Sequence, residues 1–300
     1  MNNNPLVSII VITYNSAKYV LETLESAKTQ TYQNIELIIS DDCSTDNTVA
    51  ICQKWIMENK ERFIRAELIE TKSNAGISAN CNRGMRAATG EWAKLIAGDD
   101  ILLDNCIADN ILFIKNNPAA EIIYSKPKRF GGDESSMQIS EDHYLKNEWI
   151  FEEPSSVQLQ KQMERTPFWY TATQFIKKEI WAKFEFDDAY PNIEDTPFVL
   201  KCLKSGYKLF YFPIYTVKYR FGHSDSVQNL HSNKLANFNL YRNEFFLYDI
   251  RSRGILFAWN NYLSHFIGKK SHRKYKFLLL LSPYFVFYFI LRHLGIKNKI

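Results

Sequence analysis

The first segment that constrains the fold is a continuous apolar and β-branched run at residues 6–13, LVSIIVIT, which ends directly in the polar residues Tyr14 and Asn15. Such a run is typical of a strand that is buried on both faces of a sheet. It has no basic residue before it and no small-residue cleavage site after it, so it does not resemble a signal peptide. The start of the chain therefore predicts a central strand of an α/β domain.

Short apolar strands alternate with helical patterns through the first 125 residues. The expected strands are 6–13, 35–40, 64–69, 92–96 and 121–124. The expected helices are 18–30, 46–60, 77–88 and 103–116. This alternation predicts a mainly parallel, Rossmann-like central sheet with helices on both faces. Right-handed crossovers then place the carboxyl ends of the strands at one edge of the sheet, where ligands usually bind.

The pattern is weaker after Ser125. Residues 126–165 are polar and irregular, and predict a loop-rich insertion. Further strands are expected at 170–176, 207–212 and 214–219, with a helix at 196–205, and helical spacing resumes at 226. We therefore predict a catalytic domain over 1–222 and a helical C-terminal extension over 223–300.

Charge and cysteine content limit the partners and the compartment. Residues 254–300 contain eight Lys or Arg and no acid, whereas the rest of the chain carries 29 basic and 33 acidic residues. This asymmetry predicts a localised anionic partner and argues against nucleic-acid binding. The five cysteines form no C-x-x-C pair, so free thiols in the cytoplasm are expected.

Four polar clusters lie where strands are expected to end or helices to begin. They are Thr13-Tyr14-Asn15, the segment 41–46 (DDCSTD), the segment 74–80 (NAGISAN) and Gly98-Asp99-Asp100. Each alone has a structural explanation as a turn or a helix cap. Together they suit a sugar nucleotide, because a carboxylate accepts the imide N–H of uracil or thymine and paired carboxylates bind Mg²⁺ or Mn²⁺. The chain lacks the glycine-rich motifs of P-loop and dinucleotide-binding proteins.

The segments VSIIVITYN, DDCSTDNT, NAGISANCNRG, AATGEW and AGDD, in this order, resemble the family-2 inverting glycosyltransferases with a GT-A fold over about residues 5–220. The resemblance implies a nucleotide-diphospho-sugar donor of UDP or dTDP type. The residues that it assigns to the donor are Thr13, Tyr14 and Asn15 at the nucleoside, Asp42 at the base, and Asn74, Gly76 and Ser78 around the pocket.

The same resemblance assigns Asp99 and Asp100 to the metal-and-ribose motif, with Mn²⁺ or Mg²⁺ as the cofactor. One departure is Ala97, because members of the family often carry an acid two residues before Asp99. The division of roles between Asp99 and Asp100 therefore stays open.

Inverting transfer also needs a carboxylate that deprotonates the acceptor hydroxyl. The NIEDT segment at 192–196 resembles the Glu-Asp motif of the family, which implies that Asp195 is the base and Glu194 its alternate or orienting partner. The structural alternative is that these acids favour a helix N-terminus. Arg220 and His223 resemble the end of the family's catalytic domain. Their implied roles are a phosphate clamp for Arg220 and a metal or diphosphate contact for His223, and the alternative is an ordinary surface position.

The basic C-terminal part contains fifteen uncharged residues at 277–291, FLLLLSPYFVFYFIL. A helix of this length reaches about 22 Å, which is short of the roughly 30 Å membrane core. Basic residues flank it, namely Lys269, Lys270, Arg273, Lys274, Lys276, Arg292 and Lys297. Residues 269–293 therefore predict a segment that lies on anionic membrane. The alternative is a helical hairpin that packs on the catalytic domain or forms a dimer.

The resulting expectation is a metal-dependent inverting glycosyltransferase, peripheral on the cytoplasmic face of the membrane. The expected acceptor is a lipid-linked glycan in the biosynthesis of a surface polysaccharide such as O-antigen or capsule. Two alternatives are a sugar nucleotidyltransferase and a non-catalytic membrane-bound scaffold that keeps the donor fold. A nucleotidyltransferase would require a basic, glycine-rich loop at residues 13–16. The scaffold is disfavoured by the four acids Asp42, Asp99, Asp100 and Asp195.

Overall fold

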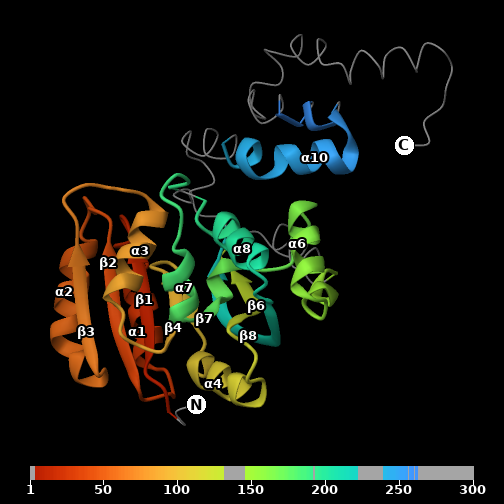
Figure 1. The fold of residues 1–300 in the computed structure, drawn as a ribbon. Helices are drawn as coiled ribbons and strands as arrows, with labels where there is room; N and C mark the ends of the chain where they lie inside the picture. The colour runs from red at the N-terminus through yellow and green to blue at the C-terminus, as the bar shows by residue number, and fades with distance from the viewer. Residues whose placement is uncertain are drawn as a thin grey trace. The chain divides into compact units, whose positions relative to one another are not determined.

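The computed structural model describes residues 4–131, 146–191, 193–221, 239–255, 257–259 and 261–262. The chain divides into two compact units, residues 1–226 and 227–300, which we describe separately (Figure 1). The predicted boundary after residue 222 stays a prediction, because residues 222–238 lie outside the described part of the chain.

The first unit is built on one eight-stranded sheet in the order β3-β2-β1-β4-β7-β6-β8-β5. Four neighbouring strands are parallel: β3 (Arg65–Glu70), β2 (Ile35–Asp41), β1 (Val7–Thr13) and β4 (Trp92–Ala97). The other four are β7 (Phe175–Lys177), β6 (Ile122–Phe130), β8 (Phe210–Arg220) and β5 (Ile101–Leu102). Here β7 is antiparallel to β4 and β6, β8 is parallel to β6, and β5 is antiparallel to β8. The predicted α/β class is confirmed.

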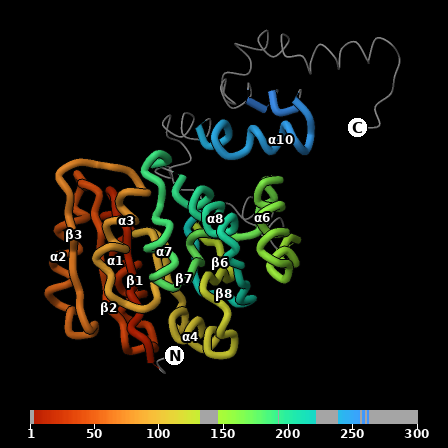
Figure 2. Tube along the Cα trace, in the orientation of Figure 1, coloured from red at the N-terminus to blue at the C-terminus, as the bar shows by residue number. Residues whose placement is uncertain are grey.

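Helices cover both faces of this sheet (Figures 1 and 2). One face is covered by α1 (Val20–Lys28), α2 (Thr48–Asn59) and α4 (Cys106–Asn116). The other is covered by α3 (Ile77–Ala87), α7 (Lys178–Phe184) and α8 (Asp195–Lys204), and α6 (Ser155–Met163) packs on α8. The described residues of this unit also include the short 3₁₀ turns η1 (Lys60–Arg62), η2 (Glu148–Phe151) and η3 (Thr171–Thr173).

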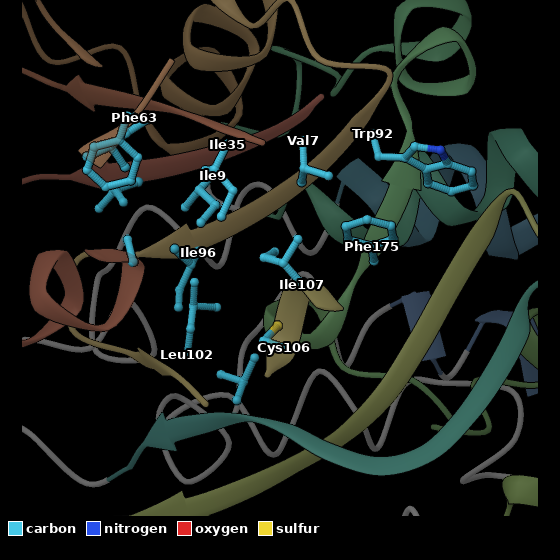
Figure 3. Packing of buried hydrophobic residues seen from close by; sticks show 14 of the residues in the cluster. Val7, Ile9, Ile35, Phe63, Trp92, Ile96, Leu102, Cys106, Ile107 and Phe175 are labelled. Carbon is cyan, nitrogen blue, oxygen red and sulfur yellow. The ribbon is translucent and has the colours of Figure 1, made fainter. Parts of the chain in front are cut away.

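The core follows from the alternation of side chains along the strands. In β1, Val7 and Ile9 point into the cluster under α1 and α2, whereas Ile10 points into the cluster under α3. Figure 3 shows the first cluster, in which the rings of Trp92 and Phe175 stack at 5.2 Å and join β4 to β7. This two-sided burial explains why β1 and β2 read as unbroken apolar runs.

The half of the unit after residue 125 differs most from the sequence expectations. The strand expected at 121–124 continues to Phe130, and the strands expected at 207–212 and 214–219 are one strand, β8. The β6–β8 register shifts on either side of Lys126, which lets a proline-containing strand stay paired. The expected strand at 170–176 is wrong, since η3 occupies 171–173 and only Phe175–Lys177 is a strand.

The region 126–165 was expected to be irregular and instead contains the second half of β6, η2 and α6. The polar composition of this region gives no apolar periodicity from which these elements could be predicted. Each buries only a few residues, for example Ile150 and Phe151 in η2 and Gln158, Gln162 and Met163 in α6.

In the second unit, a π-helical turn at Tyr241–Phe245 runs into α10 (Phe246–Arg253). The buried carboxylate of Asp249 accepts a hydrogen bond of 2.7 Å from the Tyr241 hydroxyl. The helical pattern expected from residue 226 is thus seen from residue 239 onward. The predicted membrane segment 269–293 lies outside the described residues. Within the described part of the chain, each helix is too short or too polar to cross a bilayer.

Candidate active site

Side-chain hydrogen bonds connect the loops that follow β1 and β2. The Thr13 hydroxyl donates a 2.8 Å hydrogen bond to Asp41, whose carboxylate also accepts bonds from the backbone and hydroxyl of Ser44. Asn15 has a left-handed backbone (φ 51°), and its side-chain oxygen accepts the Thr45 N–H at 2.8 Å. These bonds hold the predicted nucleoside loop rigidly, with the Tyr14 ring half exposed beside it.

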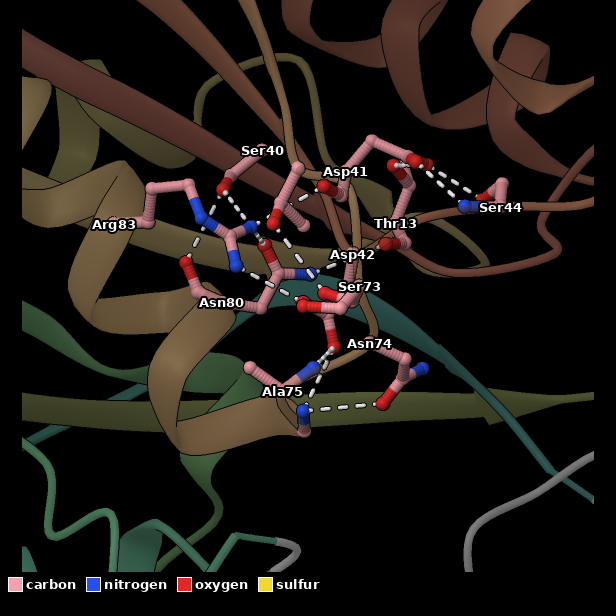
Figure 4. Close-up of polar contacts among 12 residues, drawn as sticks. Thr13, Ser40, Asp41, Asp42, Ser44, Ser73, Asn74, Ala75, Asn80 and Arg83 are labelled. Carbon is pink, nitrogen blue, oxygen red and sulfur yellow. Dashed lines mark hydrogen bonds and ion pairs between the residues drawn. The ribbon is translucent and has the colours of Figure 1, made fainter.

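The Asp42 carboxylate, like that of Asp41, accepts three hydrogen bonds (Figure 4). It is 2% exposed, and one oxygen accepts the backbone N–H groups of Ala75 and Gly76 at 3.0 and 2.8 Å. The other oxygen accepts from Arg83 at 2.9 Å. A carboxylate offers about four acceptor positions, so capacity remains for about one further donor. Its predicted contact with the nucleobase stays a prediction.

Arg83 is a site residue that the sequence did not assign. Its guanidinium also donates to the Ser40 hydroxyl, the Asp41 carbonyl and the Asn80 side chain, at 3.0 to 3.3 Å. Asn80 in turn donates to the Thr13 carbonyl at 3.1 Å. The available signal was spacing, because Asn80 and Arg83 are three residues apart on α3 and share a face of that helix.

The loop before α3 connects this region to the predicted catalytic pair. Gly76 has φ +89° and lies so close to Pro191 that an added Cβ would be 2.8 Å from its side chain. Ser78 is fully buried, its N–H donates to the Pro191 carbonyl and its hydroxyl to the Tyr190 carbonyl. The Asn74 side chain accepts the Gly76 N–H at 3.2 Å. The part assigned to Ser78 in the pocket therefore stays a prediction, while its observed contacts hold the segment that leads to Glu194.

Asp99 and Asp100 form the turn that follows β4. Asp100 is 2% exposed, and its carboxylate accepts the Arg220 N–H at 2.8 Å. Desolvation, and then the neighbouring Asp99 carboxylate, raise the pKa of Asp100 well above its usual range. Two adjacent oxygen-donor groups that repel each other when ionised suit a hard divalent cation. The described residues hold no cluster of three or more His, Cys, Asp or Glu, so a cation here would need other ligands, such as phosphates.

Arg220 holds this turn through several contacts. Its Nε donates to the Asp99 carbonyl at 2.8 Å and its Nη2 pairs with Glu22 at 2.8 Å. The guanidinium lies between the rings of Tyr19 and Phe130, 4.2 and 4.3 Å from their centroids. These contacts position the Asp99–Asp100 turn, and the predicted role of Arg220 on phosphate stays a prediction. His223 lies outside the described residues.

Glu194 and Asp195 begin α8. Asp195 accepts hydrogen bonds from the Thr171 hydroxyl at 3.0 Å and from the Thr196 N–H at 2.5 Å. Desolvation raises the pKa of Asp195 despite these bonds, and desolvation together with the Asp195 charge raises the pKa of Glu194 to about 8.

Lys94 supports the turn that contacts Asp195. Its buried ammonium in β4 donates to the carbonyls of Ala172, within η3, and Gln174, directly after η3, at 2.5 and 3.2 Å. Burial lowers the pKa of Lys94 to about 8. Sequence reasoning left Lys94 unassigned, because an isolated lysine in a strand gives no sign of its partners.

Two observations relate the three acidic groups in space. The buried Cys81 thiol has its pKa raised by desolvation, with contributions from Glu194, Asp42 and Asp195, so the charges of both the base-side and the nucleoside-side acids reach it. The Tyr170 ring, next to Thr171, is 6.2 Å from the Tyr219 ring, and the pKa of Tyr219 is raised by desolvation and then by Asp100 and Asp99. Asp42, the Asp99–Asp100 turn and the Glu194–Asp195 pair thus share neighbours, and their joint role as one site stays a prediction.

Solved structures share this fold. A crystal structure of S. aureus TarS 1-349 in complex with UDP-GlcNAc matches with a TM-score of 0.61 at 16% identity, covering 87% of this chain and 81% of TarS. The mannosyltransferase PcManGT from Pyrobaculum calidifontis, in complex with GDP-Man and Mn²⁺, matches with a TM-score of 0.58 at 17% identity, covering 93% of this chain and 71% of PcManGT. The architecture is therefore the GT-A fold.

Sequence comparison defines the family. The model of glycosyl transferase family 2 matches residues 8–182, more than half of the chain, so the protein belongs to glycosyl transferase family 2. Glycosyltransferase GlyG of Streptococcus pneumoniae is 37% identical over 102 residues, 34% of this chain and 33% of GlyG. The Escherichia coli protein WfaP, a UDP-Glc:alpha-D-GlcNAc-diphosphoundecaprenol beta-1,3-glucosyltransferase, is 36% identical over 110 residues. That match spans 37% of this chain and 41% of WfaP.

The raised pKa of Glu194 predicts how stability depends on pH. Since the folded protein holds this proton more tightly than the unfolded chain, the Glu194 contribution to the free energy of unfolding falls as pH rises from about 4.5 to about 8. Glu194→Gln should flatten this fall, as measured by urea unfolding at several pH values. The exposed Glu58 gives the matched control, Glu58→Gln. Parallel profiles for wild type and Glu194→Gln would contradict the prediction.

Proposed function

We propose that this protein transfers a sugar, with inversion, from a UDP- or dTDP-type nucleotide-diphospho-sugar to a glycan acceptor. The observation that carries the proposal is the hydrogen-bonded connection from Thr13 and Asp42, through the Gly76 loop and Pro191, to the segment of Glu194 and Asp195. This connection holds Asp42, the acid on the nucleoside side, in position relative to Asp195, the acid proposed as the base. The names of WfaP and the UDP-GlcNAc complex of TarS support a donor of this class.

In this proposal Asp195 is the general base. Thr171 and Thr196 orient its carboxylate, and its raised pKa favours proton uptake near neutral pH. As Asp195 removes the proton of the acceptor hydroxyl, the hydroxyl oxygen forms a bond to the anomeric carbon. The bond from that carbon to the diphosphate breaks on the opposite side. The products are an inverted glycoside and a nucleoside diphosphate.

Asp99 and Asp100 are the residues that would hold a divalent cation. Bound there, Mn²⁺ or Mg²⁺ would offset the charge that develops on the leaving diphosphate. The Mn²⁺ complex of PcManGT supports this assignment. Arg220 keeps the turn of both acids in place through its contacts with Asp99 and Asp100.

We further propose that the acceptor is lipid-linked and that the protein works on the cytoplasmic face of the membrane. The name of WfaP, which specifies a diphosphoundecaprenol acceptor, supports this setting. The basic and apolar composition of residues 269–293 supplies the means of attachment.

The proposal is tested by sugar transfer and by nucleotide binding on the same variant. Asp195→Asn should lower kcat by about 10²- to 10⁴-fold, the usual contribution of a general base, while the Kd for UDP with Mn²⁺ stays unchanged. Calorimetry measures the binding, and release of UDP from a panel of nucleotide sugars measures turnover.

Asp109→Asn is a suitable control, since Asp109 is also a partly buried aspartate in the first turn of a helix. Unchanged turnover in Asp195→Asn would remove Asp195 from the reaction. Wild-type protein that binds none of the nucleotides with Mn²⁺ present would support the non-catalytic scaffold instead.

The cation site is tested by separating metal-dependent from metal-independent affinity. Asp100→Asn keeps an acceptor oxygen for the Arg220 N–H and removes one negative charge. It should weaken UDP binding in Mn²⁺ by roughly 10- to 100-fold, comparable to changes around other protein metal sites, and leave UDP binding in EDTA unchanged. Equal Mn²⁺ enhancement in wild type and variant would exclude Asp100 as a ligand.

Membrane attachment is tested on the full chain. Wild-type protein should co-sediment with phosphatidylglycerol vesicles at low salt and less so at high salt, because salt screens charge attraction. A variant with Lys269, Lys270, Arg273, Lys274 and Lys276 changed to Gln should sediment less. Vesicles of phosphatidylcholine are the uncharged control. Binding that is insensitive to both salt and these substitutions would contradict the electrostatic part of the proposal.

A further inference from the structure

A recess lies in the first unit, on the β6–β8 side of the sheet. It is formed by β6, β8, η2 and residues 168–170, and about 410 Å³ of space lies outside atoms there, including space open to solvent. Seven of its eleven lining residues are aromatic. We call it the aromatic pocket.

The aromatic pocket combines ring faces with one charged pair. Its inner wall includes Tyr124 and Phe151, which are 1% and 2% exposed, while Tyr215 at its rim is 46% exposed. On the wall, the Lys126 ammonium and the Glu148 carboxylate lie 3.5 Å apart, and the Tyr211 hydroxyl donates to Glu148. The pocket thus offers apolar ring faces together with a cationic hydrogen-bond donor, Lys126, and an anionic acceptor, Glu148.

This combination suits a pyranose ring. A sugar presents C–H groups on its faces, which pack on the electron-rich faces of aromatic rings, and hydroxyls at its edge, which donate and accept. A purely hydrocarbon ligand would leave the Lys126–Glu148 pair facing an apolar surface, which is costly. A nucleobase has a separate predicted position at the ends of β1 and β2, and β4 and β7 stand between those strands and β6 in the sheet.

The pocket also adjoins the predicted base. Tyr170 lines it, and the next residue, Thr171, donates its hydroxyl to Asp195. The hydroxyl of Tyr124, another lining residue, accepts a 2.7 Å bond from Gln174, directly after η3. A ring held in this pocket would therefore lie next to the residues that hold Asp195.

We infer that the aromatic pocket is an acceptor subsite, which binds one pyranose ring of the glycan that receives the sugar. The inference rests on the proposed function and adds the location of the acceptor to it. It also assigns Tyr215 and Glu148, neither of which is part of the donor or base groups, as residues that determine acceptor affinity.

Saturation-transfer NMR on the full chain tests the pocket. The probes are the methyl glycosides of glucose, galactose, mannose and N-acetylglucosamine at millimolar concentration. At least one should bind wild-type protein, and Tyr215→Ala should weaken that binding by about 3- to 10-fold, as expected for the loss of one aromatic contact. Trp149→Ala is the matched control, because Trp149 is 50% exposed and lies outside the pocket lining.

A second variant, Glu148→Gln, keeps the shape of the wall and should also weaken glycoside binding. Calorimetry of UDP with Mn²⁺ on each variant separates the two proposals. Wild-type protein that binds UDP but none of the glycosides overturns the acceptor subsite. So does glycoside affinity that is equal in wild type and both variants, or a loss confined to UDP. Glycoside binding without UDP binding would instead contradict the donor part of the proposed function.

Discussion

The arrangement of the site depends on the hydrogen bonds that the buried Asp42 carboxylate accepts. A carboxylate removed from water must find partners, and Asp42 finds them in Arg83 and in two N–H groups of the loop before α3. Its own N–H donates to the Thr13 carbonyl at 3.0 Å. One side chain thus joins the ends of β1 and β2 to the Gly76 loop, and through Pro191 to the segment before α8.

Four acids of the first unit differ in the direction in which the protein shifts their pKa. Glu36 is buried, yet bonds from Ser8, Thr89 and Gly90 outweigh desolvation and lower its pKa. Desolvation prevails at Asp100, Glu194 and Asp195, where the pKa is raised. Acids of the first kind stabilise the fold. Perturbed groups of the second kind cluster at functional sites, which supports the roles proposed for these three acids.

Sequence reasoning was most successful where strands are buried on both faces. The four parallel strands and helices α1 to α4 were predicted to within a few residues, because apolar runs and helical spacing alternate there, whereas the short β5 and η1 were missed. Sequence reasoning also singled out Asp42, Asp99, Asp100 and Asp195, whose positions after strands or before a helix marked them. After residue 125 burial is less continuous, since β8 is only partly buried along most of its length, η3 buries Thr173, and α7 buries Ile180 and Trp181. The single long β8, the turn η3 and helix α7 therefore escaped prediction.

The sequence by itself determined the α/β order of the first half, the family of the protein and the acids that line one edge of the sheet, since each is written in a contiguous segment. Only the tertiary structure decided which groups those acids meet. Arg83 reaches Asp42 from α3, Lys94 holds η3 from β4, and Thr171 reaches Asp195 from a turn 24 residues earlier. The aromatic pocket likewise draws its walls from β6, β8, η2 and residues 168–170. Such pairings depend on how distant segments pack, and local patterns of residues carry no record of that packing.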